Sequence, residues 1–145
     1  MSVPSPECEF CRAPGGAVLW QNDLCRVVRA DEPDYPGFLR VILQRHAREM
    51  TDLDESERAG LMAVVWAVEA VVRKVMEPDK MNVASLGNMT PHVHWHVIPR
   101  FTDDRHFPAP VWAAPKREPQ VPAARCDAAR RLMTGLAARL GPPSA

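Results

Sequence analysis

Three histidines at alternate positions are the residues of this 145-residue chain best suited to chemistry. His92, His94 and His96 lie in the run His-Val-His-Trp-His-Val-Ile, between two prolines. Because a β-strand sends alternate side chains to one face, all three imidazoles would point one way and the apolar residues between them into a core. A neutral imidazole can attack phosphorus and form a covalent phosphoramidate, while its neighbours hold phosphate oxygens or relay a proton. The spacing therefore predicts a nucleophilic site on one face of a strand.

Metal binding is the rival interpretation of these histidines. A His-x-His pair on a strand also ligates zinc in some proteins, with a third ligand from elsewhere in the chain, and His106 or His46 could serve here. A metallohydrolase site would also need an aspartate inside the motif, and the motif has none. We therefore favour the nucleophilic interpretation.

A Cys-x-x-Cys pair near the N-terminus is a second candidate for metal binding. Cys8 and Cys11 have the spacing of half a tetrahedral zinc site. Two reduced thiols on a mobile segment are the alternative. A redox function is disfavoured, because no helix start is expected after the pair to lower the pKa of a thiol.

The strands expected to position these residues follow from apolar patterning and turn signals. They are expected at residues 17–20, 24–29, 38–44, 80–86 and 92–100. The first two form a hairpin, and the last carries the histidines. Together with a long helix before the fourth strand, this order predicts an α+β fold with a mostly antiparallel five-stranded sheet.

The long central helix is expected at about residues 54–76. Asp54 and Glu57 have the capping-box spacing that marks a helix start. One apolar stripe consists of Leu61, Val65, Val68, Val72 and Val75, and a second consists of Met62 and Trp66. A helix this apolar on more than one face needs cover on two sides. We expect one stripe on the sheet and the other at a subunit interface, which predicts a homodimer.

The chain divides into three segments that we expect to form one domain, as its length suggests. Residues 1–16 contain the cysteine pair, residues 17–100 contain the sheet and long helix, and residues 101–145 follow. This last segment comprises a proline-rich arm, anchored by Val111 and Trp112, and a C-terminal helix at 123–140. Trp112 could also stack on a base.

Composition limits the classes of partner. Lys+Arg and Asp+Glu balance at 18 each, so the chain lacks the basic excess of a nucleic-acid-binding protein, whereas a small phosphorylated ligand needs only local donors. The first residues do not resemble a signal sequence, and the longest apolar stretch belongs to the amphipathic helix. We therefore expect a cytoplasmic protein with no membrane or nucleic-acid partner.

The histidine run, continued by Pro99-Arg100, resembles the H-φ-H-φ-H-φ-φ signature of the histidine triad (HIT) family of nucleotide hydrolases and transferases. Segments 36–46 and 52–53 are similar to the strand, loop and helix start that precede this signature in the family. The resemblance covers about residues 8–100, with a HIT-like domain at 17–100. It implies a two-layer α+β fold, usually a homodimer, of the bacterial diadenosine-polyphosphate-hydrolase type.

The resemblance also implies a role for each histidine. The middle histidine is the nucleophile of the family, so His94 would attack the α-phosphorus and carry the nucleotidyl group until water takes it. His96 would contact the phosphate or help to protonate the leaving group. His92 would orient His94 through the strand.

A structural zinc ion follows from the same resemblance. Some bacterial proteins similar to this one pair a Cys-x-x-Cys with two histidines, so Cys8 and Cys11 would bind Zn²⁺ together with His46 and His92. His92 would then be both a metal ligand and an orienting residue. No organic cofactor is expected.

Departures from the family pattern concern the substrate. Phe38 stands where a histidine commonly follows Pro-Gly, and Asn88 replaces the glutamine of a Gly-Gln pair but can still donate to a phosphate. Asp31 lies next to the position that commonly holds a ribose-binding residue, here Ala30, and could substitute for it. Arg100 could neutralise phosphate charge, the alternative being a solvated arginine at a strand end.

We therefore expect a nucleotide hydrolase or transferase that cleaves a nucleoside monophosphate from dinucleoside polyphosphates or nucleoside phosphoramidates, through a covalent nucleotidyl-histidine. The alternative is a metal-binding or nucleotide-binding module with little or no turnover. The missing histidine at Phe38 and the short loop before the triad favour that alternative.

Overall fold

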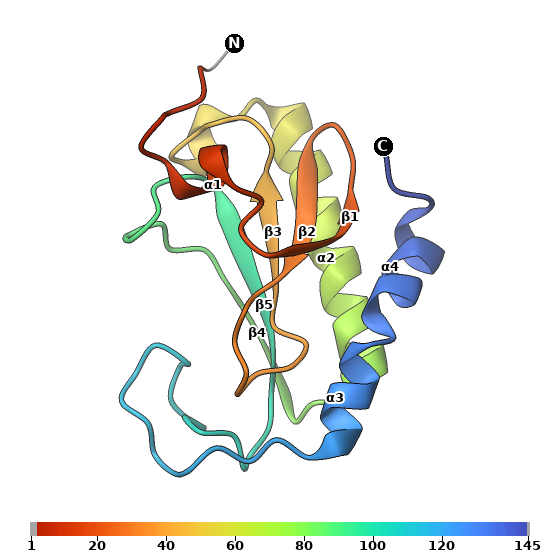
Figure 1. Cartoon of the computed structure of the whole chain (residues 1–145). Coiled ribbons are helices and arrows are strands. Elements are labelled where there is room, and N and C mark those ends of the chain that lie inside the picture. Colours follow the sequence, from red (N-terminus) through yellow and green to blue (C-terminus); the bar gives the residue numbers. More distant parts are fainter. Residues whose placement is uncertain (1–2, 145) are drawn as a thin grey trace.

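The chain is an α+β protein with one five-stranded sheet, in a computed structural model that describes residues 3–144 (Figure 1). All neighbouring strands are antiparallel, in the order β1-β2-β3-β5-β4. The strands are β1 (Ala17–Gln21), β2 (Cys25–Arg29), β3 (Leu39–Leu43), β4 (Lys80–Ala84) and β5 (His94–Arg100). The helices are α1 (Glu9–Arg12), the 3-10 helix η1 (Met50–Asp52), α2 (Glu55–Met76), α3 (Ala123–Ala129) and α4 (Leu132–Leu140). Residues 1–2 and 145, at the ends of the first and last expected segments, lie outside the described residues.

Helix α2 covers one face of the sheet. A reciprocal capping box fixes its start, as predicted: the Asp54 side chain accepts from the Glu57 amide at 2.8 Å, and the Glu57 carboxylate accepts from the Asp54 amide at 3.1 Å. The buried residues of the first stripe are Leu61, Val65, Val68 and Val72, which share a core with Leu39, Val41, Leu43 and Val97. The odd-numbered residues of β3 and β5 therefore face α2. No helix within residues 3–144 has the length and apolarity that a membrane crossing requires.

The C-terminal segment forms two helices, not the single helix expected at 123–140. Between them the Arg131 amide donates to the Ala128 carbonyl, three residues back, which tightens the chain at the junction of α3 and α4. Leu132 and Leu136 of α4 are then fully buried in the core beside α2. Helices α3 and α4 thus cover part of the apolar surface of α2 that does not face the sheet, which we expected a partner subunit to cover. Trp66 of α2 nevertheless remains 56% exposed.

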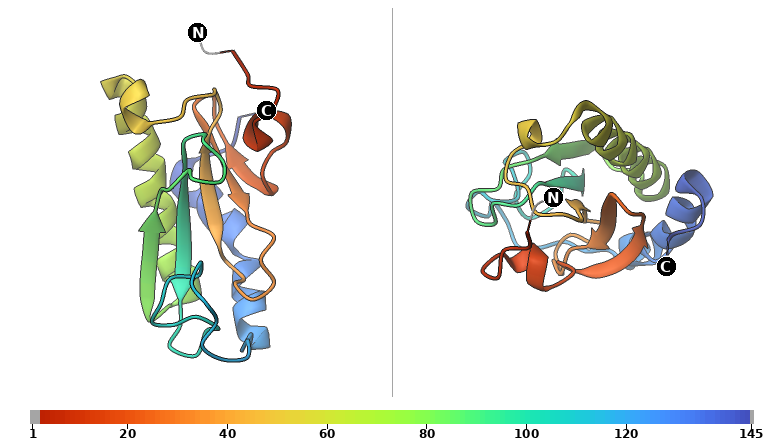
Figure 2. Two further views of the ribbon diagram at one scale, coloured as in Figure 1. Left: turned by 90° about the vertical axis from the view of Figure 1, so that its left-hand side faces the viewer. Right: turned by 90° about the horizontal axis from the view of Figure 1, so that it is seen from above.

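The N-terminal segment lies over the opposite face of the sheet from α2 (Figure 2). Phe10 of α1 packs against Val28 of β2 and Ile42 of β3. Gly15 permits this close approach, because a Cβ at this position would lie 2.8 Å from the Ile42 side chain. The φ angle of Gly15 is +88°, which also favours glycine. The even-numbered residues of β3 and β5 thus face away from α2, and Ile42 lies directly against the N-terminal segment.

Candidate active site and metal centre

His94 and His96 lie side by side on β5, on the face away from α2. Their ring centroids are 4.9 Å apart and the rings meet edge to face at 84°. The cross-strand neighbours of these histidines on β3 are Ile42 and Arg40, respectively. Both rings line a cavity of about 490 Å³ although each residue is largely buried. The strand therefore presents two imidazoles to one pocket.

The third histidine lies outside the strand in which we expected it, because β5 begins at His94. The chain bends after Pro91, where the His92 amide donates to the Thr90 carbonyl at 2.8 Å. The bend turns the His92 ring toward the N-terminal segment, with Nδ1 3.3 Å from Cys8 Sγ. Its side chain is consequently separated from the other two rings.

The backbone fixes the tautomer of His94. Its Nδ1 lies 2.6 Å from the carbonyl oxygen of His92, and a carbonyl only accepts, so Nδ1 carries the proton. Nε2 then holds the lone pair on a ring that lines the cavity. Burial lowers the pKa of His94 more than the bond to His92 raises it, and the charge of Arg40 lowers it further. The ring is therefore neutral and nucleophilic near pH 7.

His96 is a neutral hydrogen-bonding group. Burial, followed by the charges of His94 and Arg40, lowers the pKa of His96 to about 3. Its Nδ1 is buried and has no hydrogen-bond partner within residues 3–144. Because buried N–H groups without an acceptor are rare, the proton belongs on Nε2. His96 can thus donate one hydrogen bond at the cavity but does not supply an acidic proton at neutral pH.

The cavity has a polar part and an apolar part. The polar side chains beside the two histidines are Arg40, Asn88, Thr90 and Glu9. The apolar lining consists of Phe10, Leu86, Met89 and Trp112, the last three of which are exposed. Trp112 meets the edge of His96 with ring centroids 5.0 Å apart. Such a mixed lining suits a ligand that carries both a charged group and a flat apolar group.

Of the three residues predicted to bind substrate, the structure brings only Asn88 to this cavity. Asp31 lines a separate hollow together with Pro33 and Cys126. Arg100 is 1% exposed, so it is neither at the cavity nor a solvated residue at a strand end. Its guanidinium donates to the Asp104 carboxylate at 2.8 and 3.0 Å, to Asn82 and to the Ala109 carbonyl. Arg100 is occupied in holding the arm against the sheet.

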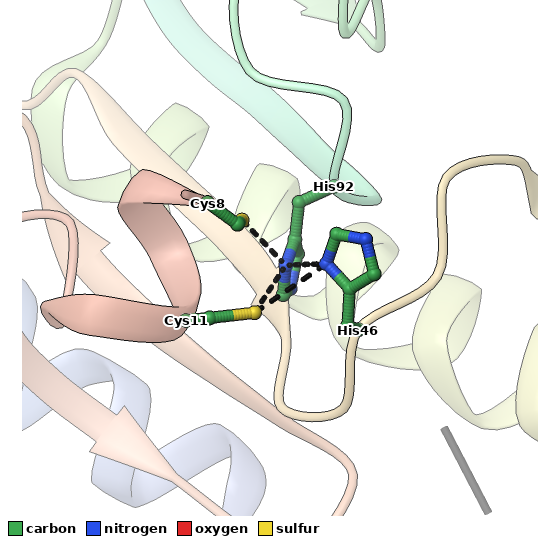
Figure 3. A group of neighbouring side chains, drawn as sticks. All are labelled: Cys8, Cys11, His46 and His92. Atoms are coloured by element: carbon green, nitrogen blue, oxygen red, sulfur yellow. Dashed lines mark hydrogen bonds between the residues drawn. The ribbon is translucent and has the colours of Figure 1, made fainter. Parts of the chain in front are cut away.

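Four side chains on the other side of Phe10 could hold a metal ion (Figure 3). They are Cys8, Cys11, His46 and His92, and their ligand atoms all lie within 4.8 Å of one another. The closest pairs are Cys8 Sγ–His92 Nδ1 and His46 Nδ1–His92 Nδ1 at 3.3 Å, Cys11 Sγ–His46 Nδ1 at 3.4 Å and Cys11 Sγ–His92 Nδ1 at 3.7 Å. A tetrahedral ion with bonds of ~2.0–2.3 Å to nitrogen and sulfur has ligand–ligand edges of about 3.3–3.8 Å. The four atoms therefore have the spacing of a tetrahedral site.

His92 is prepared for metal binding through its second ring nitrogen. Nε2 lies 2.7 Å from the Leu43 carbonyl and so carries the proton, which leaves the Nδ1 lone pair for a metal. Burial lowers the pKa of His92 and so disfavours the protonated ring that could not bind an ion. Neither His94, His96 nor His106 belongs to any metal-like cluster within residues 3–144. The rival prediction of a metal held by the alternating histidines therefore has no matching geometry.

The cysteine pair lies at the start of a short helix, contrary to our expectation. Cys8 is the N-cap of α1, and Cys11 belongs to its single turn. Burial nevertheless raises the pKa of Cys11, so the helix start does not activate this thiol. Phe10 stands between the cysteines and meets the His94 ring with centroids 4.9 Å apart at 78°. The metal cluster and the cavity thus share one wall.

Comparison with known proteins decides the family. A model of the HIT domain family matches residues 15–103. The chain belongs to the HIT family. AP-4-A phosphorylase of Mycobacterium tuberculosis is 33% identical over 117 residues, which cover 73% of this chain and 60% of that protein. Asymmetrical bis(5'-nucleosyl)-tetraphosphatase of Schizosaccharomyces pombe is 33% identical over 91 residues, which cover 59% of this chain and 50% of that protein. The chain spans only 50–60% of the length of these curated relatives.

Solved structures share the same HIT fold. A histidine triad protein from Bradyrhizobium japonicum has a TM-score of 0.71 and 28% identity, over 87% of this chain and 91% of that one. A histidine triad protein from Marinobacter aquaeolei has a TM-score of 0.71 and 26% identity, over 87% of this chain and 92% of that one. A Zn-bound histidine triad family protein from Mycobacterium smegmatis is 24% identical with a TM-score of 0.64, over 91% and 94% of the two chains, a likeness in fold.

Among the cavity residues that were missed from sequence, Arg40 and Phe10 lie next to the histidines. Arg40 could have been found from sequence, because it is the only charge in the apolar run 38–43. In the structure its alternate neighbour on β3, Ile42, pairs with His94, which places Arg40 on the same face of the sheet. Phe10 had no such signal. Its place beside His94 depends on how a segment more than 80 residues away in sequence folds back over the sheet.

Proposed function

We propose that the protein is a nucleotidyl hydrolase or transferase that uses His94 Nε2 as its nucleophile. The observation that carries this proposal is the bond from His94 Nδ1 to the His92 carbonyl, which directs the lone pair of a neutral ring into the cavity. The named activities of the two curated relatives support a dinucleoside polyphosphate as one substrate class. Nucleoside phosphoramidates are the other class that the same chemistry serves.

The reaction takes place in two steps. In the first, His94 Nε2 bonds to the α-phosphorus while the bond from phosphorus to the leaving oxygen or nitrogen breaks, and the electron pair departs with that group. In the second, water attacks the phosphorus, the P–N bond returns its electron pair to His94, and nucleoside monophosphate and a proton are released. A different acceptor in place of water would give transfer.

Two polar side chains and one aromatic side chain assist this reaction. His96 donates from Nε2 to a phosphate oxygen, and Asn88 lies on the same cavity to hold a second one. Trp112 lines the cavity beside His96 with an exposed indole on which a base can stack. The orienting role that we propose for His92 belongs to its carbonyl group, which accepts from His94 Nδ1, while its ring points toward the cysteines.

The metal that we propose for the Cys8, Cys11, His46 and His92 cluster is Zn²⁺. Two thiolates and two imidazoles at tetrahedral spacing are a ligand set that zinc prefers. Four protein ligands leave no open position, so the ion would be structural and would hold α1 on the sheet. The Zn-bound histidine triad family protein from Mycobacterium smegmatis, which has the same fold, supports this choice of ion. Reduced ligand thiols fit the cytoplasm, which we propose as the location.

A homodimer is supported by the exposed side of α2 and the free edge of the sheet. Trp66 of α2 and Met81 of the edge strand β4 line one open hollow together with Trp112. A second copy could pair along β4 and cover Trp66, which is 56% exposed. Sedimentation velocity would show a dimer for the wild type and a monomer for Trp66→Glu. A wild type that sediments as a monomer at all concentrations contradicts the dimer.

Replacement of His94 tests the function directly. His94→Ala should lower the rate of diadenosine tetraphosphate or adenosine phosphoramidate cleavage by about 10⁴-fold, because the covalent route is lost. His106→Ala is the matched control, since His106 lies outside the cavity and contacts Tyr35. Rapid quenching of the wild type in an alkaline denaturant, in which a P–N bond to histidine survives, should also trap a nucleotidyl group on His94, identified by peptide mass spectrometry.

Unchanged turnover in His94→Ala would rule out the proposed nucleophile. If the wild type binds nucleotide but yields neither turnover nor a trapped adduct, the protein is a nucleotide-binding module, the alternative that the sequence left open.

A further inference from the structure

Arg40 is a charged residue in a strand that is otherwise apolar. Its neighbours Leu39 and Val41 are fully buried, and Arg40 is the one residue of β3 that is partly exposed. The guanidinium lies on the same face as the alternating histidines and lines the same cavity. Placing a charge against an apolar sheet costs free energy unless hydrogen bonds or an opposite charge compensate for it. We therefore ask which groups Arg40 bonds to.

The hydrogen bonds of Arg40 are far from complete. Nη1 donates to the Gly15 carbonyl at 3.2 Å, and Nε is buried without a partner in the described part of the chain. Within residues 3–144, no carboxylate lies within 4.0 Å of its guanidinium. The face of Phe38 lies 5.5 Å away and offers only a weak cation–π contact.

Two arginines that are buried, unlike Arg40, show what a structural arginine looks like in this fold. Arg26 donates to Gln44 and to the carbonyls of Phe10 and Pro14. Arg100 is paired with Asp104. Arg40 has neither a set of carbonyls nor a carboxylate, although it is next to two imidazoles. Arg40 lines the cavity, so a bound anion there is the partner that its guanidinium lacks.

The register of the sheet places Arg40 beside His96 and not beside the nucleophile. Arg40 is the cross-strand neighbour of His96, whereas Ile42 is the neighbour of His94. One such step along a strand is about 6–7 Å. A phosphorus bonded to His94 is therefore one step away from Arg40, and the phosphate groups that follow it can reach the guanidinium.

We propose that Arg40 is a specificity residue that binds the phosphate chain of the leaving group. This inference rests on the proposed function and adds which leaving group the site favours. When the P–O bond breaks, its electron pair and negative charge stay on the departing phosphate oxygen, where Arg40 stabilises them. An amine leaving group instead has to gain a proton, and neutral His96 does not provide an acidic one. Glu9, the only acidic residue of the cavity lining, accepts from the Thr90 hydroxyl and not from Arg40.

The test compares two leaving groups in one variant. Arg40→Gln should lower kcat/KM for diadenosine tetraphosphate by about 10- to 100-fold, the range expected when a hydrogen bond to a charged group is lost. It should change kcat/KM for an adenosine phosphoramidate by less than about 3-fold, because its leaving amine carries no phosphate chain. Arg40→Lys, which keeps the charge, should recover part of the loss. Tripolyphosphate should inhibit the wild type competitively and Arg40→Gln much more weakly.

Arg29→Gln is the matched control, because it removes the same charge from an exposed position at the end of β2. Retained phosphoramidate cleavage shows that Arg40→Gln is folded. Equal losses with both substrates in a variant whose circular dichroism and melting are unchanged, or no loss with either, would overturn the role of Arg40. If the wild type cleaves neither substrate, the proposed function itself has failed, which is a distinguishable result.

Discussion

Trp112 occupies an unusual position for a large aromatic residue, since it is half exposed yet in contact with the buried His96 ring. Its indole is 52% exposed and meets His96 edge to face. Leu86 and Met89 are also exposed on the same cavity. Exposed apolar side chains on the same cavity as two buried imidazoles suit a nucleotide whose base contacts the former and whose phosphate contacts the latter.

Substitution of this tryptophan should affect binding more than chemistry. Trp112→Ala should raise KM for nucleotide substrates about 10-fold and leave kcat nearly unchanged, because base–aromatic stacking contributes roughly 1–3 kcal/mol. Trp112→Phe should be intermediate. Met133→Ala removes a comparably exposed apolar side chain from α4 and serves as the control. A kcat that falls while KM stays constant would contradict a stacking role.

At the candidate active site, the positions of residues could be predicted from sequence where they depend only on neighbours in the chain. The placement of His94 and His96 on one face follows from strand alternation within five residues. Arg100 and Asp31 could not be judged in this way, because their surroundings depend on long-range folding. Arg100 is turned away from the cavity by Asp104, which a tight turn after β5 brings next to it.

The short helix α1 links the candidate metal cluster to His94, the nucleophile that we propose. Cys8 and Cys11 flank Phe10, whose ring packs against both His92 and His94. An ion bound by the cysteines would hold this turn of helix on the sheet. Four residues of helix are not stable alone, so the ion and the packing of Phe10 have to supply the stability.

Loss of one metal ligand should therefore weaken the whole N-terminal segment. Cys8→Ser should lower the zinc content of the purified protein from about one ion per chain to near zero, lower the Tm and reduce kcat for all substrates, since Phe10 would no longer fix His94. Elemental analysis, melting curves with and without chelator, and kinetics check these outcomes. Cys126→Ser, in α3, is the control. Full activity in a metal-free Cys8→Ser protein would separate the ion from the active site.

The elements could be predicted where apolar pattern and turn residues agree. Asn22 closes the expected hairpin, because its side-chain oxygen accepts from the amides of Leu24 and Cys25 at 2.9 Å. The break between α3 and α4 had no comparable sign in sequence. It accompanies a close fit of α4 on α2, where a Cβ at Gly135 would come within 2.9 Å of Val71.

At the scale of the whole molecule, one buried ion pair joins the proline-rich arm to the sheet. Arg100 of β5 and Asp104 of the arm are both about 2% exposed in their side chains. Burial alone would raise the pKa of Asp104, but hydrogen bonds from Arg100 and from the amides of Phe101 and His106 outweigh this and hold the pKa below its ordinary value. Asp104 therefore stabilises the fold in its charged form.

Removal of this carboxylate should be costly, because it leaves Arg100 buried without a counter-charge. Asp104→Asn should lower the free energy of unfolding by about 3–5 kcal/mol, measured by urea denaturation at pH 7. Asp127→Asn, in an exposed ion pair with Arg130, should change it by less than about 1 kcal/mol. A comparably small effect at both positions would show that the buried pair does not hold the arm.

The pH dependence of stability has a definite sign. Since the folded pKa of Asp104 lies below the unfolded value of ~3.9, its stabilisation is complete well above that pH and is lost as the pH falls below about 4. His96 contributes an earlier loss that begins near pH 6.5, because its folded pKa is also lowered. Unfolding measured from pH 7 to 3 should therefore show a steeper decline below pH 4 in the wild type than in Asp104→Asn.

Cys8 and His92 lie 84 positions apart in sequence, yet their ligand atoms are neighbours in the metal cluster. An ion shared by them closes a loop that contains four strands of the sheet and all of α2, and closing a loop of that length restricts the unfolded chain. The order of the two ligands in the chain also determines when this loop can close during synthesis. The N-terminal segment is synthesised first, but its partner His92 emerges only after the long helix, so the wall that Phe10 forms beside His94 waits for most of the sheet to be made.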